Sequence, residues 1–252
     1  MSPTGRTQFI IISPDAAIIE SEAAYIDTVR QLDDEDKLVG DPLTVARVAR
    51  ITGRLVSIAV ADFPDSADWK WSVAIVDDTE TVNAWCMAGG RMAVYTGLFD
   101  QLELTDDEFA QIMGHEISHA LANHTAERMS QAMATAAGMA VIGAASDNSS
   151  VAMAGASVLA NVALTLPNSR DAENEADVMG MVLATKAGYD PEAAVTLWQK
   201  MGDLNDERPA EFLSTHPAPE NRQAALNVMI PRMLKINSDR TKAPIHPVTI
   251  VQ

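Results

Sequence analysis

The chain has 252 residues and 47% of them are hydrophobic, which is enough to bury a sizeable core within one domain, with or without a mobile cap. Its formal net charge of −17 argues against binding to nucleic acid or to an anionic membrane, and a solvated acidic surface accounts for it. Aromatic residues make up only 5%, while Ala and Met are abundant, and this composition favours packed helices. We therefore predict a single, mainly helical domain over residues 1–252.

Two helices are predicted near the start of the chain, over residues 14–32 and 42–61. Pro14 and Pro42 stand at first-turn positions, each next to an Asp, and proline suits that position because its missing N–H is not needed there. An acidic linker, residues 33–36, separates the two helices.

A small sheet is predicted to follow the two helices. Residues 69–76 alternate between apolar and polar positions as a strand does, and residues 81–87 and 92–96 flank the Gly89-Gly90 pair as a hairpin. The expected fold class is mainly α with a small antiparallel β-sheet, an α+β arrangement.

The next predicted helix carries a HExxH motif. Thr105 and Glu108 form a capping-box pattern at its start. Apolar residues then recur at three- and four-residue spacing, at Phe109, Ile112, Met113, Ile117 and Leu121. His115 and His119 project from one face and can bind a single zinc ion, while the adjacent Glu116 can hold a water molecule for catalysis. The alternative is a core helix with two hydrogen-bonded histidines.

A second acidic helix start offers the third metal ligand. A catalytic zinc site needs three protein ligands, and with one Cys and three further histidines in the chain a carboxylate is expected. Residues 169–177 open a helix in which Glu173 and Asp177 share a face, while Glu175 points elsewhere. We predict Glu173 as the ligand and Asp177 as the acceptor behind a ligand histidine. The alternative is a solvated acidic first turn.

Residues 131–166 hold two apolar runs rich in small residues, separated by the polar stretch 146–150. Each run has about 14–16 residues, fewer than the roughly 20 that a membrane-spanning helix needs. We predict a helical hairpin, either packed on the core or forming a lid over the site. Two more helices are predicted near residues 191–201 and 219–235, and the polar tail 237–252 is expected to be ordered only where it docks.

Four motifs occur in the order and spacing of a known family, and they are Asn83-Ala84-Trp85 with Gly89–Leu98, the HExxH motif at His115–His119, Arg170 with Glu173, Ala176 and Asp177, and Thr215-His216-Pro217 with Arg222. With them the chain resembles the gluzincin family of HtpX, Oma and Ste-type CAAX proteases, and in particular its soluble periplasmic members of the BepA and LoiP type. Trp85, Cys86 and Ala88 depart from the usual pattern, which bears on the substrate groove and not on the metal site.

The resemblance implies a zincin-like fold and one Zn²⁺ per chain, held by His115, His119 and Glu173, with Glu116 as the catalytic base. It also implies that His216 faces the metal. His216 is expected to act either as a donor to the reacting oxygen or as a fourth ligand in a resting enzyme, with an ordinary loop histidine as the alternative.

The groups around the ligands are predicted as well. Arg222 joins Asp177 behind the ligands, where it orients His216 or contacts substrate. His124 and His246 have no partners in the sequence and are predicted to lie at the surface. Asn83, Ala84 and Trp85 are expected on an edge strand beside the cleft, where an extended peptide adds as a further strand.

These features together predict a zinc-dependent endopeptidase that cleaves unfolded or misassembled envelope proteins, including outer-membrane proteins. The alternative is a chaperone-like protein that binds such clients while its protease site is latent. Residues 1–6 show no signal peptide, which taken literally indicates the cytoplasm. The resemblance instead leads us to expect a periplasmic lipoprotein, anchored by lipid to the outer membrane, whose signal precedes this chain. The sequence does not indicate an oligomeric state.

Overall fold

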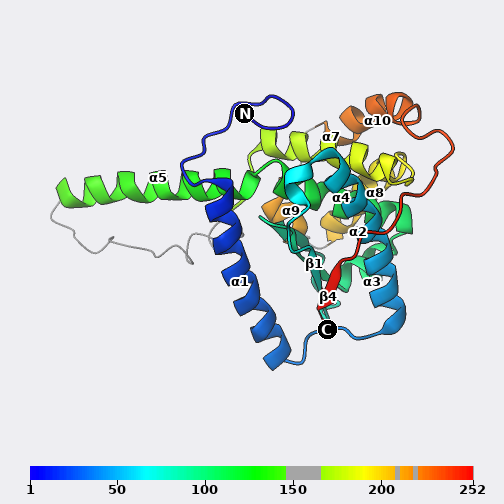
Figure 1. Cartoon of the computed structure of the whole chain (residues 1–252), viewed down its shortest axis with the longest axis horizontal. Coiled ribbons are helices and arrows are strands. Elements are labelled where there is room, and N and C mark those ends of the chain that lie inside the picture. Colours follow the sequence, from blue (N-terminus) through cyan, green and yellow to red (C-terminus); the bar gives the residue numbers. More distant parts are fainter. Residues whose placement is uncertain (146–165, 208–210, 218–220, 252) are drawn as a thin grey trace.

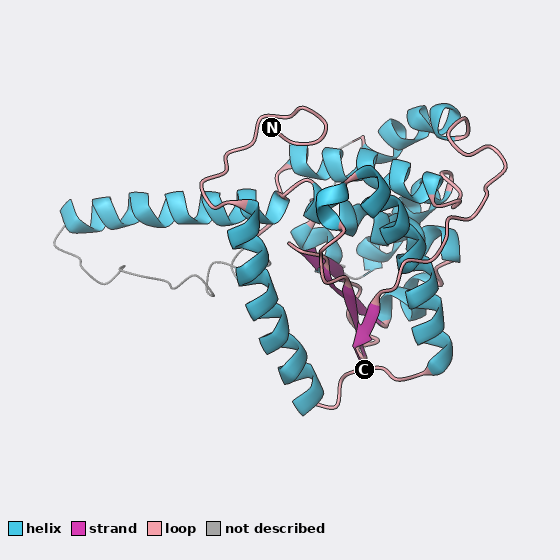
Figure 2. Cartoon of the chain, in the orientation of Figure 1, coloured by secondary structure: helices cyan, strands magenta, loops and turns pink. Residues whose placement is uncertain are grey.

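The computed structural model describes residues 1–145, 166–207, 211–217 and 221–251. Helices make up most of the molecule and surround a small sheet (Figure 2). In chain order the elements are α1 (Pro14–Asp34), α2 (Pro42–Asp62), the short 3-10 helix η1 (Pro64–Ser66), β1 (Ser72–Val76), β2 (Ala84–Met87), β3 (Arg91–Tyr95), α3 (Gly97–Leu102), α4 (Asp106–Leu121), α5 (His124–Ala145), α7 (Arg170–Lys186), α8 (Ala193–Glu207), α9 (Glu211–Thr215), α10 (Arg222–Met233) and β4 (Thr249–Val251). The predicted α+β class is confirmed.

The sheet has the strand order β2-β3-β1-β4. β2 and β3 form the predicted antiparallel hairpin, whose turn holds Gly89 and Gly90 at φ +80° and +77°, a conformation that side chains with a Cβ rarely adopt. β1 pairs in parallel with β3 and with β4, so the sheet is mixed and not purely antiparallel. Residue alternation along a strand does not reveal the direction of its neighbour, which is why the sequence did not indicate these pairings. β2 and β4 form the two edges.

The C-terminal segment, residues 237–251, lies against the domain and ends in β4 (red in Figure 1). His246 donates its backbone N–H to the Gly53 carbonyl oxygen at 2.9 Å, and the Asn237 amide binds the Thr185 carbonyl oxygen at 3.2 Å. The polar tail is thus held by docking, and its strand extends the sheet beyond β1.

Helix α4 forms the centre of the molecule. It begins with the predicted capping box, in which Thr105 Oγ1 accepts from the Glu108 N–H at 3.2 Å and Glu108 accepts from the Thr105 N–H at 2.9 Å. The helix is almost entirely buried and packs against α2, α7, α8 and β2. At the crossing with α7, a Cβ on Gly114 would lie 2.8 Å from the Gly180 carbonyl oxygen, so glycine permits the close approach of the two helices.

Helix α5 projects away from the rest of the domain, and α1 packs near its base (Figure 1). Residues 131–145 of the predicted hairpin continue α5, while residues 146–165 lie outside the described residues. The choice between a core hairpin and a lid therefore stays a prediction. Among the residues that the structure describes, no helix combines the length and the apolar character that a membrane crossing requires.

Candidate metal centre

Four buried side chains from three parts of the fold converge beside α4. α4 supplies His115 and His119 one turn apart, α7 supplies Glu173 from its first turn, and His216 follows the end of α9. The ligand atoms of the four residues all lie within 4.8 Å of one another. The structure therefore brings together the three predicted ligands and the histidine that the sequence left between donor and fourth ligand.

Five separations between nitrogen and oxygen atoms of these residues are close to the edge length of a coordination tetrahedron, with one or the other Glu173 oxygen as the partner. His115 Nε2 lies 3.0 Å from His119 Nε2 and 3.3 Å from Glu173 Oε2, and His119 Nε2 lies 3.3 Å from Glu173 Oε1. His216 Nδ1 lies 3.3 Å from His115 Nε2 and 3.0 Å from Glu173 Oε1. Ligands bound at zinc distances in a tetrahedron are about 3.3 Å apart. The four side chains fit a single ion of that size.

Hydrogen bonds behind the two α4 histidines turn their Nε2 lone pairs toward each other. His115 Nδ1 lies 3.0 Å from Asp177 Oδ1, and because a carboxylate only accepts, this Nδ1 carries the proton. His119 Nδ1 lies 2.7 Å from His124 Nδ1, and His124 Nε2 lies 3.0 Å from Glu175 Oε2, so the same reasoning places a proton on His119 Nδ1. Two facing lone pairs repel unless a proton or a metal ion lies between them, and a metal ion fits this position.

The charges of the cluster favour a cation. Burial lowers the pKa of His115, but Glu173 and Asp177 outweigh it and raise that pKa to about 9. Burial holds the pKa of His119 well below its usual value, so this imidazole is neutral and able to coordinate. Burial raises the pKa of Glu173, but His216, His115 and His119 together lower it far below its usual value. The set of nitrogen ligands and one anionic oxygen suits zinc.

Glu116 lies beside the cluster. The residue is 1% exposed, its Oε1 makes no hydrogen bond to the described residues, and His216 Nε2 lies 3.4 Å from that oxygen. Burial raises the pKa of Glu116 despite the opposing effect of His216 and His115. A carboxylate with a raised pKa and a free oxygen is suited to exchange a proton with a reacting group.

Asp177 and Arg222 lie directly behind the cluster. Arg222 donates to the two Asp177 oxygens at 2.7 and 2.6 Å and to Glu173 Oε2 at 3.1 Å, and its guanidinium lies 3.4 Å from the centre of the Trp198 ring. Arg222 is buried and makes no hydrogen bond to His216. It therefore orients Asp177 and Glu173. Its Nη1 is buried without a hydrogen-bond partner among the described residues, and contact of Arg222 with His216 or with substrate stays a prediction.

His216 is buried against two further side chains. Its ring stacks on Phe212 with 4.4 Å between the ring centres, and its Nδ1 lies 3.4 Å from the Asn168 amide nitrogen. The residue is not an exposed loop histidine, since it is 4% exposed. Phe212 and Asn168 had no signal in the sequence analysis, because their roles depend on contacts across the fold.

The structure corrects the prediction that His124 lies at the surface. His124 is 1% exposed and connects His119 with Glu175, which points away from the cluster as predicted. Asn123, at φ +57°, separates α4 from α5, and this break places His124 beside His119. An asparagine directly before a new helix was the available signal, since Asn tolerates the left-handed conformation. His246 is partly buried in the docked C-terminal segment.

The predicted substrate strand lies at an edge of the sheet and next to α4. Asn83 precedes β2, while Ala84 and Trp85 lie in it, and β2 packs against α4. The Tyr95 N–H donates to the Asn83 carbonyl oxygen at 3.1 Å, so the backbone groups of Asn83 face β3. In an antiparallel pair these directions alternate, and the N–H and C=O of Ala84 therefore face away from β3, although Ala84 itself is buried.

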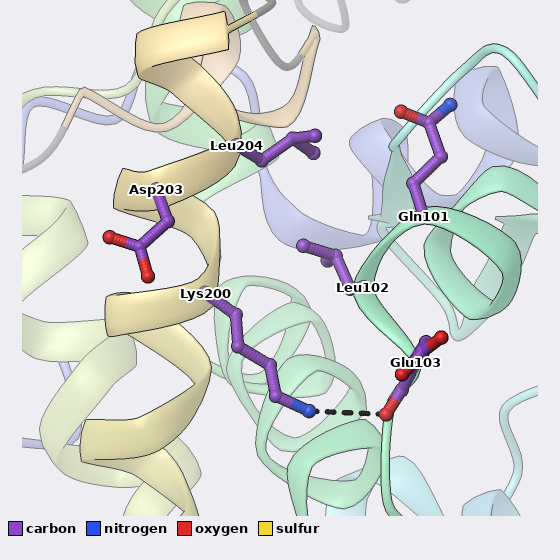
Figure 3. Close-up of a pocket in the computed structure, with 6 residues that line it drawn as sticks. All are labelled: Gln101, Leu102, Glu103, Lys200, Asp203 and Leu204. Atoms are coloured by element: carbon purple, nitrogen blue, oxygen red, sulfur yellow. Dashed lines mark hydrogen bonds between the residues drawn. The ribbon is translucent and has the colours of Figure 1, made fainter.

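A surface pocket between α3 and α8 shares no residue with the cluster (Figure 3). It has a volume of about 290 Å³ and is lined by Gln101, Leu102, Glu103, Lys200, Asp203 and Leu204. Lys200 donates to the Glu103 carbonyl oxygen at 3.1 Å and to Glu108 at 2.8 Å, so its charge is already paired. We therefore regard the histidine–glutamate cluster as the functional site.

Comparison with known proteins agrees with this geometry. A 163-residue stretch is 36% identical to the mitochondrial metalloendopeptidase OMA1 of Arabidopsis thaliana, covering 64% of this chain and 32% of that protein. A 224-residue stretch is 31% identical to the β-barrel assembly-enhancing protease of Escherichia coli, covering 84% of this chain and 45% of that protein. The chain thus spans about a third to a half of the length of these relatives. The family model of peptidase family M48 matches residues 42–230, and the chain belongs to this family of metallopeptidases.

Proposed function

We propose that the protein is a zinc endopeptidase that cleaves unfolded or misassembled proteins of the cell envelope. Membership of a metallopeptidase family supports the reaction class. The observation that carries the proposal is the buried set of His115, His119 and Glu173 at tetrahedral spacing, with the free oxygen of Glu116 beside it.

The residues of the site have separate tasks in this proposal. His115, His119 and Glu173 hold the ion, which when bound acts as a Lewis acid and makes water acidic enough to ionise near neutral pH. Glu116 accepts a proton from the attacking water and passes it to the departing amine, which its raised pKa favours. His115 donates its Nδ1–H to Asp177, so its Nε2 lone pair stays available to the ion.

The position of His216 supports a resting conformation. Its Nδ1 is close enough to His115 and Glu173 to occupy the fourth corner of the tetrahedron, where water is needed for catalysis. In an active conformation the ring would leave this corner and donate to the developing oxyanion from the side of Glu116, which lies 3.4 Å from its Nε2. This also favours the second candidate function, a client-binding protein whose protease site is latent.

The open edge of β2 supports an extended polypeptide as the substrate. The backbone N–H and C=O of Ala84 face away from β3, and a peptide laid along the strand would pair with them, which gives affinity with little sequence preference. Because Ala84 is buried and Phe212 of α9 donates its N–H to the Val82 carbonyl oxygen, the peptide would first have to displace the groups that cover this edge. Such binding selects unfolded segments, because a folded protein rarely offers a free strand. The E. coli relative is named for enhancing β-barrel assembly, and this supports envelope proteins as clients. A lipid-anchored periplasmic location is part of the proposal and rests on the resemblance in the sequence.

Digestion of casein by the purified protein tests this function. We expect cleavage that stops on chelation and returns with Zn²⁺, and we expect Glu116→Gln to keep the ion while losing nearly all cleavage. Tight casein binding without cleavage, also after zinc loading, would favour the client-binding function. Full cleavage by Glu116→Gln would remove Glu116 as the base.

A further inference from the structure

A chain of hydrogen bonds links His119 to the first residues of the protein. His119 Nδ1 lies 2.7 Å from His124 Nδ1, His124 Nε2 lies 3.0 Å from Glu175 Oε2, and the same carboxylate oxygen accepts from Arg6 Nε at 2.9 Å. His124 is 1% exposed and Glu175 5% exposed, so two polar groups inside the protein form this link and water does not.

The direction of the chain follows from the chemistry of its far end. Glu175 can only accept, so His124 donates to it from Nε2 and leaves the lone pair on its own Nδ1. That lone pair accepts the proton of His119 Nδ1, which leaves the lone pair of His119 on Nε2, facing the cluster. A His119 ring rotated by half a turn, or the other tautomer of His119, would lose the bond to His124. The chain therefore fixes the ring and the tautomer of His119.

Several hydrogen bonds hold the N-terminal segment, residues 1–12, against the domain, so it can support the hydrogen bonds behind His119. Arg6 also donates to both oxygens of Glu127, at 3.0 and 2.6 Å, in a two-pronged ion pair. Gln8 donates to the Ala122 carbonyl oxygen at 2.7 Å, next to the break between α4 and α5. The backbone N–H groups of Ile11 and Ile12 both donate to Ser130 Oγ at 2.9 Å. Figure 1 shows this segment (dark blue) passing beside the start of α5.

We infer that His124, Glu175 and Arg6 are positioning residues for the ligand His119, and that the docked N-terminal segment is part of the support of the metal centre. The inference rests on the proposed ligand set. It predicts that the segment before α1 affects metal affinity although Arg6 contacts neither the ion nor a substrate. Groups behind metal ligands typically change metal affinity by about 10–100-fold, which sets the size of the expected effect.

Substitution of His124 tests the inference with two matched variants. His124→Phe keeps a ring but removes both hydrogen bonds, whereas His124→Gln keeps one acceptor and one donor. Competition with a chromophoric chelator should show a loss of Zn²⁺ affinity of about 10–100-fold for His124→Phe and a much smaller loss for His124→Gln. The visible absorption of the Co²⁺-loaded protein should change for His124→Phe, because it reports ligand geometry. Equal affinities and spectra for wild type and His124→Phe, or a folded His124→Gln as weak as His124→Phe, would overturn the inference.

Arg6 provides a second test, which remains decisive if the His124 variants do not fold. We expect Arg6→Ala to weaken Co²⁺ and Zn²⁺ binding and Arg6→Lys to restore part of the affinity. The control is Arg30→Ala, since Arg30 forms an exposed pair with Asp27 and should leave affinity unchanged. Equal affinities for Arg6→Ala and Arg30→Ala contradict the inference. Wild-type protein that binds neither metal contradicts the proposed ligand set itself, so the two failures are distinguishable.

Discussion

The two histidines of α4 are supported in different ways. Behind His115 a carboxylate, Asp177, accepts directly from the ring, and the buried Arg222 holds that carboxylate. Behind His119 the support is longer, because a second imidazole stands between the ring and the carboxylate of Glu175. The first support belongs to α7 and α10 in the body of the domain. The second runs from α5 through Glu175 of α7 to a segment that precedes the first helix.

The two supports differ in the contacts that their arginines make and in how deeply those arginines are buried. Arg222 serves two parts of the cluster at once, since it binds both Asp177 and Glu173. Arg6 reaches the cluster only through Glu175 and His124, and its side chain is 19% exposed against 3% for Arg222. Perturbing the His115 side should therefore cost more metal affinity and more stability than perturbing the His119 side.

The largest difference in metal affinity is expected between substitutions of Glu173 and of Glu175, which lie two residues apart on α7. Glu173→Ala removes the oxygen of a proposed ligand, so we expect a loss of metal binding well beyond the roughly 10–100-fold that supporting groups cost. Glu175→Ala should keep the ion with an affinity reduced within that range. Zinc content per chain and chelator competition measure both. A variant of Glu175 that loses the ion while Glu173→Ala keeps it would reverse the assignment of the two carboxylates.

The two arginines give the next contrast. Arg222→Ala leaves two buried carboxylates without their cation, and breaking such a buried pair costs about 3–5 kcal/mol. Arg6→Ala leaves Glu175 with its hydrogen bond from His124 and Glu127 with its hydrogen bond from Gln8, so a smaller cost of about 1–3 kcal/mol is expected. Urea unfolding of the metal-free proteins measures both values. Equal losses of unfolding free energy in the two variants would show that the two arginines contribute equally to stability, contrary to this prediction.

A single methyl group added at the crossing of α4 and α7 should lower both stability and metal affinity, because α4 carries both histidines and α7 carries the carboxylates behind them. Gly114→Ala would place its Cβ 2.8 Å from the Gly180 carbonyl oxygen, and forcing α4 and α7 apart should cost about 1–3 kcal/mol and weaken metal binding. Gly202→Ala on α8 is the matched control, since its Cβ would meet nothing within 4 Å and helix propensity favours Ala. Thermal unfolding of both variants checks the contrast, which fails if Gly114→Ala is as stable as the control.

The smallest effect is expected at the start of α4, which both histidines share. Burial raises the pKa of Glu108, but Lys200, Thr105 and Thr196 outweigh it and lower that pKa below 4.5. A lowered pKa in the folded state stabilises the protein above the unfolded value and is lost as pH falls through the folded value. Glu108→Gln should therefore destabilise by about 1 kcal/mol at pH 7 and by less at acid pH, without changing metal affinity. Denaturant unfolding at two pH values tests this, and a deficit that grows on acidification contradicts it.

Local signals made much of the centre predictable from the sequence. The capping box located the start of α4. Helical periodicity predicted that His115 and His119 share one face of α4, that Glu173 and Asp177 share one face of α7, and that Glu175 lies on another face. Such features depend on residues within one or two turns of each other, where backbone geometry fixes which side chains share a face.

The remaining features depend on contacts between distant segments. Arg6 and Glu175 are 169 positions apart, and nothing local to either residue indicates the pairing. His124 was placed at the surface because the sequence offers it no partner. Its partner Glu175 comes from α7, and the break at Asn123 turns His124 toward His119. The parallel pairing of β4 with β1 likewise joins the end of the chain to a strand near residue 72.

The most direct test of the metal centre is an anomalous difference map from crystals of the purified protein, measured on both sides of the zinc absorption edge. We expect one peak, present only above the edge, within bonding distance of His115 Nε2, His119 Nε2 and a Glu173 oxygen. A zinc-loaded protein with its peak elsewhere, or with no peak between these three side chains, would contradict the account.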